Sequence, residues 1–279
     1  MRSAGDQLTH YRLAGQICEK PHEVWGAVDT RNERLVALKI LPHLSNPLLR
    51  DRLRGQADAI AEAAHPSIVV VDAIGVEDGV HFVCTEAIEG TSLADLVQRG
   101  GFDPARLLRH AVTLADAVRT AHDAGVTHRE LAPDRVFVTQ ADILRIHDFG
   151  LSATDEGGED PNRDPEDTPT LTLTRDGSRR DLAYLAPEQI KNLPLDYRTD
   201  IYSVGAILYF MATGVNPFHG ESPADLFVAV LRDLPRPVKQ LKHDVADGLA
   251  AIIERCLRKE RDQRYPGAGE LHAELAKLI

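Results

Sequence analysis

The pattern of apolar residues changes near Gly90, and this change constrains the fold more than any other feature of the sequence. Before Gly90, short apolar runs are bounded by turn residues and follow the alternation typical of half-buried β-strands. These runs lie at residues 11–17, 23–28, 35–41, 68–74 and 80–85. One helical stretch interrupts them and ends before Pro66, with its apolar stripe at Leu49, Leu53, Ile60 and Ala63. The first third of the chain therefore predicts a small sheet with one helix.

After Gly90 the apolar residues follow helical spacing. Helices are expected at residues 92–98 and 104–124, with Gly125 as the stop, and short strands at 135–139 and 143–146. From Pro187 onward the pattern is helical to the end. The longest apolar stretch, residues 201–215, is too short and too polar to span a bilayer, so it predicts a buried core helix. The chain is thus expected to be an α+β protein with two lobes, residues 1–87 and 88–279.

Composition and charge exclude several classes of function. A formal net charge of −11 argues against a nucleic-acid-binding surface, which needs clustered Lys and Arg. Cys18, Cys84 and Cys256 are too far apart for a zinc pair, and an odd number is no disulfide framework. They indicate a reducing compartment, so a cytoplasmic location is expected. The first ten residues lack the apolar segment of a signal peptide, and nothing in the chain predicts membrane insertion.

A series of short motifs then follows in order along the chain. They are Val36-Ala37-Leu38-Lys39, His128-Arg129-Glu130, Asp148-Phe149-Gly150, Ala186-Pro187-Glu188, the stretch from Asp200 to Gly205, and Arg264. One triplet alone is weak, but their order and spacing resemble the protein kinase superfamily, and their flanking residues resemble bacterial, eukaryotic-like serine/threonine kinases. The resemblance implies a two-lobed protein-kinase-like fold. Its N-lobe would be a small antiparallel sheet with one helix, its C-lobe larger and helical, and its activation segment residues 148–188.

The catalytic loop departs from the family's pattern at three positions. Glu130 replaces the aspartate base, and its extra methylene moves the carboxylate by roughly 1.5 Å, where a misplacement of about 1 Å can cost on the order of 100-fold in rate. Ala132 replaces a lysine that contacts the transferring phosphate. Arg135 replaces the asparagine that holds a second Mg²⁺, and at about 4 Å its charge repels a divalent ion by several kcal/mol. The chain is therefore expected to be a pseudokinase.

The resemblance also implies a nucleotide pocket with an altered phosphate end. Its residues would be Lys39, Lys20, Val24, Ala37, Thr85, Glu86, Ile88, Phe137 and Asp148. Glu86 and Ile88 would offer backbone hydrogen bonds to a purine, whereas Phe137 replaces a leucine with a larger ring. The glycine-rich loop is missing, and Pro21 has no amide to offer a phosphate. Lys20 then either meets a phosphate or belongs to a plain hairpin turn.

The ion-pair partner that the family provides for Lys39 is also missing. The apolar stripe of the predicted helix places Gln56 on its inner face, while Glu62 faces elsewhere. Gln56 can hydrogen-bond Lys39 but cannot neutralise it. Lys39 therefore either contacts a nucleotide or is an inherited strand residue without a ligand.

Arg135 leaves two readings of the site open. Its fixed charge can stand in for a metal and neutralise the phosphates of ATP directly, so that nucleotide binds without Mg²⁺. Alternatively, it is a surface arginine, or one paired with Asp148, and no ligand binds. Asp148 itself is intact and could hold one metal ion, which keeps Mg²⁺ an open question.

Further residues are expected to regulate or support the domain. The activation segment is long and acidic, which is usual for a merely solvated loop but also suits a docking or regulatory tail. The regulatory candidates are Gln56, Arg129, Thr168, Thr170, Thr172, Thr174 and Ser178, of which the Thr and Ser residues could accept phosphate and Arg129 could bind it. The resemblance implies structural roles for His128, Phe149, Glu188 and Arg264.

Three functions follow from these residues. The leading hypothesis is a catalytically impaired regulatory or scaffolding module that binds a protein partner, such as a kinase or another signalling component. The second is a weakly active enzyme, either a Ser/Thr kinase that uses Glu130 or an ATP-dependent transferase of another group. The third is a structural domain that binds no nucleotide.

Overall fold

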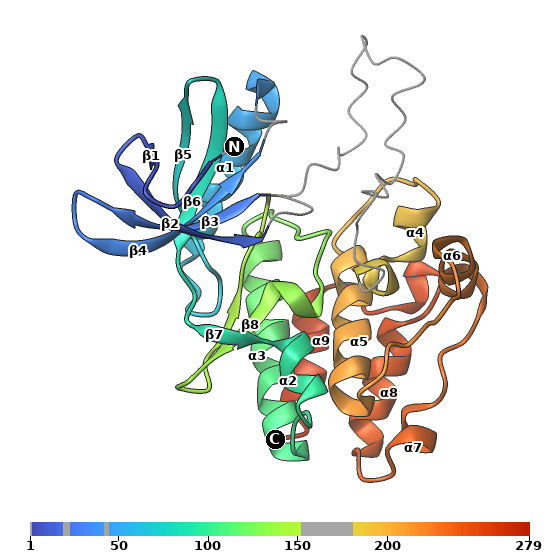
Figure 1. Cartoon of the computed structure of the whole chain (residues 1–279). Coiled ribbons are helices and arrows are strands. Elements are labelled where there is room, and N and C mark those ends of the chain that lie inside the picture. Colours follow the sequence, from blue (N-terminus) through green and yellow to red (C-terminus); the bar gives the residue numbers. More distant parts are fainter. Residues whose placement is uncertain (1, 19–22, 42–44, 152–180) are drawn as a thin grey trace.

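The computed structural model describes residues 2–18, 23–41, 45–151 and 181–279. A sheet-rich lobe, formed by the residues up to Glu86, lies against a larger helical lobe (Figure 1). This is the expected two-lobed architecture, with a small sheet and one helix in the N-lobe and a helical C-lobe.

The N-lobe is a six-stranded sheet in the order β1-β2-β3-β4-β6-β5, and each neighbouring pair is antiparallel. Its strands are β1 (Gln7–Leu8), β2 (Tyr11–Cys18), β3 (Val24–Asp29), β4 (Arg34–Ile40), β5 (Val71–Glu77) and β6 (Val80–Glu86). Alternation along the strands buries Trp25, Ala27 and Leu38 in the core of this lobe. The predicted antiparallel sheet is therefore confirmed.

One predicted strand differs from the observed one. Residues 68–74 form a single apolar run, but β5 begins only at Val71. Ile68 instead pairs with Ile146 of the C-lobe in a parallel bridge, and the Val69 amide donates to the Ile146 carbonyl at 2.8 Å. Ile68 and Val69 are buried, whereas β5 is only partly buried, so one apolar run covers both a bridge to the C-lobe and the start of an N-lobe strand.

Helix α1 (Pro47–Ala63) begins and ends with ordinary capping groups. The side chain of Asn46 accepts a hydrogen bond from the Leu48 amide, and Ala64 ends the helix in the left-handed conformation, with φ of 49°. Leu53, Ala57 and Ile60 form its buried stripe. The helix therefore packs against the rest of the protein with one face, and the partly buried Gln56 lies beside that face.

The C-lobe combines a small sheet with the remaining helices. The sheet consists of β7 (Gly90–Ser92), β8 (Val136–Thr139) and β9 (Leu144–Ile146) in that order. The helices are α2 (Leu93–Gln98), α3 (Pro104–Asp123), α4 (Pro187–Ile190), α5 (Arg198–Thr213), α6 (Pro223–Arg232), α7 (Val238–Leu241), α8 (Asp247–Cys256) and α9 (Ala268–Ala276), with 3₁₀ turns η2 (Pro133–Arg135), η3 (Asp181–Tyr184) and η4 (Arg261–Gln263). β1 and β7 were not predicted, since two or three residues are too few to show a period.

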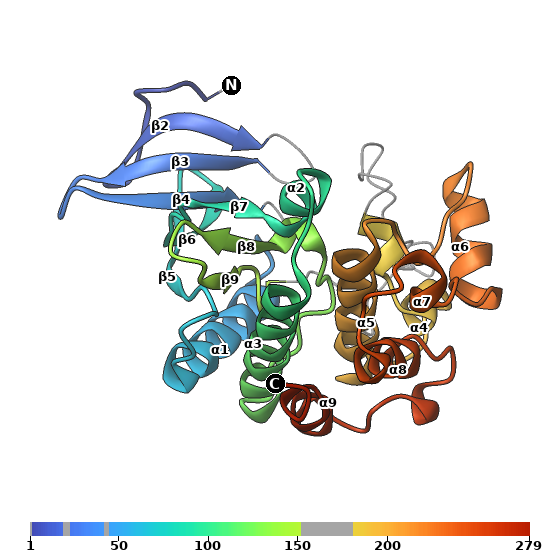
Figure 2. The ribbon, with the colours of Figure 1, turned by 90° about the horizontal axis from the view of Figure 1, so that it is seen from below.

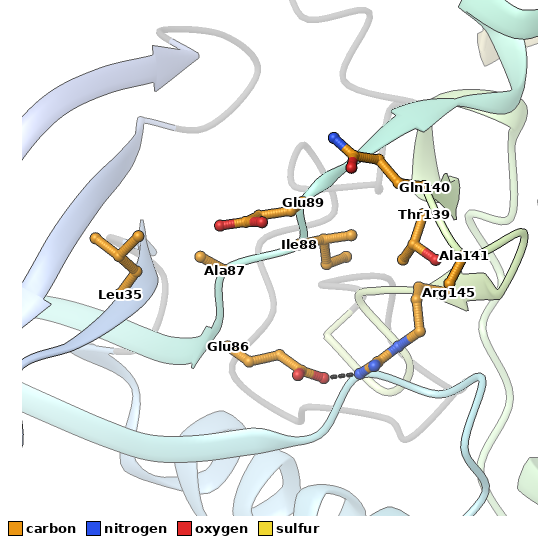
Figure 3. Close-up of a pocket in the computed structure, with 9 residues that line it drawn as sticks. All are labelled: Leu35, Glu86, Ala87, Ile88, Glu89, Thr139, Gln140, Ala141 and Arg145. Carbon is orange, nitrogen blue, oxygen red and sulfur yellow. Dashed lines mark ion pairs between the residues drawn. The ribbon is translucent and has the colours of Figure 1, made fainter.

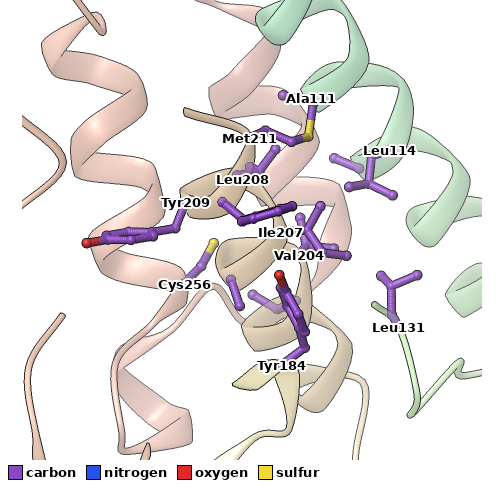
Figure 4. Close-up of a cluster of buried hydrophobic side chains, with 14 of the residues drawn as sticks. Ala111, Leu114, Leu131, Tyr184, Val204, Ile207, Leu208, Tyr209, Met211 and Cys256 are labelled. Carbon is purple, nitrogen blue, oxygen red and sulfur yellow. The ribbon is translucent and has the colours of Figure 1, made fainter. Parts of the chain in front are cut away.

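Helix α5 is the centre of the C-lobe, as the apolar stretch predicted. All of its residues from 199 to 212 are buried, and α3 and α8 pack against it (Figures 2 and 4). A Cβ atom at Gly205 would collide with Cys256 of α8, so only glycine permits this close helix approach. Among the described helices, none has both the length and the apolarity needed to cross a membrane.

Candidate functional site

Four charged or titratable side chains gather around Asp148, which follows β9 directly. Lys39 of β4 donates from Nζ to Asp148 Oδ2 at 2.8 Å, and Arg135 of η2 donates from Nη1 to the same oxygen at 2.7 Å. His147 Nδ1 lies 3.1 Å from that oxygen. Arg135 Nη2 also lies 3.1 Å from Glu130 Oε2. Asp148 is thus the shared acceptor of three nitrogen-bearing side chains, and Arg135 links the two carboxylates of the site.

This cluster holds Asp148 in its ionised form. Burial alone would raise the pKa of the Asp148 carboxyl, but Lys39, His147 and Arg135 outweigh it and hold that pKa well below its ordinary value. The Asp148 side chain is only 11% exposed, so these interactions are weakly screened by water. The carboxylate is therefore charged, desolvated and already neutralised by protein groups.

The register of the N-lobe sheet explains how Lys39 reaches this point. Val24 lies opposite Lys39 between β3 and β4, and Ala37 lies opposite Thr85 between β4 and β6. Directly paired residues, and residues two apart in one strand, have their side chains on the same face of a sheet. Val24, Ala37, Lys39 and Thr85 therefore share one face, and that face points Lys39 toward Asp148.

The proposed purine contacts are Glu86, the last residue of β6, and Ile88 in the segment that leads to β7. The Glu86 side chain is ion-paired with Arg145 of β9 (Figure 3), so what Glu86 could offer a purine is its backbone. Phe137 of β8 is half-buried, and its ring lies 5.4 Å from the ring of His147. Phe137 and His147 thus form an aromatic pair beside the Asp148 cluster.

Asp200 of α5 anchors the loop that carries His128, Arg129 and Glu130. The Asp200 carboxylate, fully buried, accepts hydrogen bonds from the backbone amides of His128 at 2.7 Å and Arg129 at 2.6 Å. His122 Nε2 lies 2.8 Å from it. Arg129 adopts a positive φ of 64°, a strained conformation that these bonds maintain. The loop that carries Glu130 is therefore rigidly placed.

Acid is expected to weaken this anchor. Burial raises the pKa of Asp200, but His122 and the His128 amide outweigh it, so that the pKa lies below its ordinary value. An Asp whose pKa is lower in the folded than in the unfolded state, where it is about 3.9, stabilises the fold at pH values above the unfolded pKa. This stability is lost as the pH falls through the folded-state pKa. Asp200→Asn should therefore unfold more easily at pH 7, by about 1–3 kcal/mol, and lose less stability than wild type below about pH 4.

Urea unfolding at several pH values measures both effects. Asp51→Asn is the matched control, because Asp51 is exposed on α1 and its removal should change neither quantity. Equal acid sensitivity of wild type and Asp200→Asn would contradict the role given to Asp200.

Other predicted site residues lie close to the cluster. Ala132 is buried, at 3% exposure, and offers no charge to a phosphate. Gln56 lies against Gly150, the third residue of the Asp148-Phe149-Gly150 motif, and a Cβ at Gly150 would be 3.0 Å from that of Gln56. Lys39 therefore bonds Asp148, and Gln56 packs on the neighbouring glycine. Glu62 is exposed, as its position on the helix predicted.

His128, Phe149 and Arg129 lie in the buried interior beneath the cluster. His128 Nε2 lies 3.0 Å from the His147 carbonyl oxygen, and its ring packs edge-on against Phe149 at 4.7 Å. Burial lowers the pKa of His128, which favours a neutral packing residue. Arg129 is 3% exposed and donates from Nε to Thr127 Oγ1 at 3.0 Å.

The remaining predicted residues lie elsewhere. Glu188 and Arg264 form a buried, bidentate ion pair in the C-lobe, at 2.6 and 2.8 Å. Outside the described residues lie Lys20, Thr168, Thr170, Thr172, Thr174 and Ser178.

Sequence reasoning overlooked His147 as a member of the site. It stands directly before the Asp148-Phe149-Gly150 motif, and a polar residue there, after an apolar strand, was an available signal. The contact joins two adjacent residues, and the Asp148 backbone has a positive φ of 72°.

Comparison with known proteins agrees with the fold and the motifs. The family model described as "Protein kinase domain" matches residues 22–274. A probable serine/threonine-protein kinase of Clostridium acetobutylicum is 32% identical over 258 residues, which cover 91% of this chain and 37% of that protein. Serine/threonine-protein kinase PknD of Mycobacterium tuberculosis is 34% identical over 253 residues, covering 89% and 36%. The chain thus spans little more than a third of the length of these relatives.

A solved structure shares the fold at lower sequence identity. The kinase domain of Mycobacterium tuberculosis PknI superposes with a TM-score of 0.73 at 20% identity, and the match covers 100% of both chains.

Proposed function

The chain belongs to the protein kinase family, and on that premise we propose that it is a pseudokinase, a regulatory or scaffolding domain without metal-dependent phosphoryl transfer. One observation carries the proposal: Arg135 donates to Asp148 at 2.7 Å, so a fixed cation lies on the carboxylate to which the family's resemblance assigns Mg²⁺.

The donor set around Asp148 does not fit a divalent metal ion. Mg²⁺ needs several oxygen ligands in near-octahedral geometry. Both carboxylates of the cluster, Asp148 and Glu130, are paired with Arg135, and Lys39 adds a second positive charge. A metal ion would have to approach two fixed cations and displace them from their carboxylates. Phosphoryl transfer relies on such ions to neutralise charge on the phosphates, so their loss supports catalytic impairment.

ATP binding is general in this family, and the residues present fit a nucleotide without metal. The backbone at Glu86 and Ile88 would hold the purine, and Lys39 and Arg135 would turn from Asp148 to the phosphates. Bound ATP would supply an anionic phosphate chain that these cations neutralise. Because Asp148 competes for the same cations, the expected affinity is modest.

The proposed role is that of a binding module in a larger system. The kinase family acts through protein substrates and partners, and a domain that keeps the shape without the metal site can still bind them. We propose a kinase or another signalling component in the cytoplasm as the partner. Gln56 of α1 lies against Gly150, beside the Asp148 cluster. Helix α1 is therefore the element proposed to transmit the effect of partner binding from one lobe to the other.

Nucleotide binding without metal is the first test. ATP is expected to raise the melting temperature of the wild-type protein equally in EDTA and in Mg²⁺, since Arg135 and Lys39 supply the charge that Mg²⁺ supplies elsewhere. Differential scanning fluorimetry with matched ionic strength measures this. A shift seen in Mg²⁺ alone would overturn the metal-independent site, and no shift in either buffer would leave the structural domain as the better function.

A weakly active enzyme is the second candidate, because the Glu130 carboxylate is 32% exposed and so open to a substrate hydroxyl. Incubation with ATP labelled on the γ or the α phosphorus, with Mg²⁺ or Mn²⁺, separates the two. The pseudokinase transfers neither label. Transfer that Asp148→Ala abolishes would establish an enzyme instead.

A further inference from the structure

A cavity of about 370 Å³ lies behind the segment that joins the lobes (Figure 3). It is bounded by β4 at Leu35, by residues 86–89 from the end of β6 toward β7, and by β8, β9 and the turn between them. None of the side chains in the Asp148 cluster lines it. Its size lies within the range of known ligand pockets, about 300–1,000 Å³.

Apolar residues line opposite sides of the cavity, and some of them are exposed to water. Leu35 is 56% exposed although it is a large hydrophobic residue, and Ile88 and Ala141 lie across from it (Figure 3). Ile143, at the edge of the same turn, is 49% exposed. A large apolar side chain exposed at a cavity, with another on the adjoining turn, favours contact with an apolar group of a partner.

The charged residues of the cavity indicate which charge the bound group of the partner should carry. Arg145 is committed to the ion pair with Glu86, so these two charges cancel. Glu89 is exposed at the rim, and the described residues offer it no ion-pair partner. The cavity therefore carries one net negative charge, on a chain whose formal charge is −11. Charge complementarity selects a basic group next to the apolar one.

The backbone of this region suits an extended peptide. Residues 87–89 belong to no strand, although they connect β6 to β7 of a second sheet. Backbone that is not part of a strand pair can form main-chain hydrogen bonds with a bound peptide, while pockets accept the side chains of the peptide. A compact small molecule would use the cavity but not the backbone of this segment.

We propose that this cavity binds a short extended segment of a partner protein. An apolar side chain of that segment lies against Leu35 and Ile88, and an adjacent Lys or Arg pairs with Glu89. The site is separate from the Asp148 cluster and does not depend on the proposed loss of catalysis. Since residues 86–88 also face the proposed purine site, peptide and nucleotide binding should influence each other reciprocally.

Fluorescence anisotropy with two labelled synthetic peptides tests the site on the full chain. The probes are Arg-Arg-Gly-Leu-Gly-Leu-Gly and its acidic counterpart Glu-Glu-Gly-Leu-Gly-Leu-Gly. The basic peptide should bind, and the acidic one at least about fivefold more weakly. Ala141→Trp fills the cavity from an exposed turn position and should weaken the basic peptide by about tenfold or more, as should Leu35→Ser. Glu89→Lys should weaken it by about fivefold.

Matched control variants away from the cavity distinguish binding in the cavity from nonspecific hydrophobic or electrostatic attraction. Leu234→Ser removes an apolar side chain that is 79% exposed, and Glu62→Lys reverses an exposed charge on α1. Neither should change binding. The proposal is overturned if neither peptide binds at millimolar concentration, if both bind equally, or if Ala141→Trp has no effect. It is likewise overturned if wild type forms a dimer in sedimentation that Ala141→Trp dissolves, because the occupant would then be a second copy of the chain.

Discussion

Replacement of Arg135 by asparagine is expected to make nucleotide binding depend on Mg²⁺. The change removes the cation that lies 2.7 Å from Asp148 and 3.1 Å from Glu130. It also adds an amide oxygen, a ligand that Mg²⁺ accepts. Repulsion between a divalent ion and a guanidinium at about 4 Å amounts to several kcal/mol at an effective dielectric constant of 20. ATP should therefore bind Arg135→Asn at least about tenfold more tightly in Mg²⁺ than in EDTA.

Isothermal titration of ATP in the two buffers measures this ratio for wild type and variant. Arg135→Lys is the matched control, because it keeps the positive charge and should keep binding independent of Mg²⁺. The idea fails if Arg135→Asn binds ATP with the same affinity in both buffers, or if Arg135→Lys becomes metal-dependent as well.

Replacement of Arg264 by alanine is expected to lower the free energy of unfolding by about 3–5 kcal/mol, since it leaves the Glu188 carboxylate buried without its partner. Arg264 is 1% exposed and Glu188 3%. Both nitrogens of the Arg264 fork bond Glu188, and Arg264 also donates to the carbonyls of Arg198, Arg258 and Lys259. Loss of the arginine thus removes several hydrogen bonds from one buried point.

Equilibrium unfolding in urea measures the loss. Lys277→Ala is the control, because the Lys277–Glu274 pair is on the surface and its removal should cost no more than about 1 kcal/mol. Glu188→Gln should be milder than Arg264→Ala, since an amide keeps one acceptor for the guanidinium. An Arg264→Ala variant that loses less than the control would show that the pair is not structurally important.

The strand and helix pattern was predictable because it depends on local spacing. The period of the apolar residues predicted the strands around Trp25 and Leu38 without knowledge of their neighbours. The apolar stretch at residues 201–215 also predicted a buried helix, which the structure places at Arg198–Thr213. The apolar pattern misplaced the start of β5, because burial of Ile68 against Ile146 produces the same apolar run as burial within the N-lobe. Short motifs in order likewise identified the family.

The state of the site was not predictable to the same degree. The sequence left Arg135 either free to meet phosphates or paired with Asp148, and it suggested Gln56 as the partner of Lys39. The structure pairs both cations with Asp148 and adds His147. Side-chain direction in the folded chain decides between such alternatives, and spacing along the sequence does not encode it.

By itself, then, the sequence determined the kinase fold, the lost glycines and the altered residues of the catalytic loop, because these are properties of single segments. Only the tertiary structure brought Lys39 to Asp148, 109 positions away, and showed that one carboxylate is shared by Lys39, Arg135 and His147. The reason is that a charge balance depends on distances in space: three segments from two lobes must fold together before their charges can compensate one another.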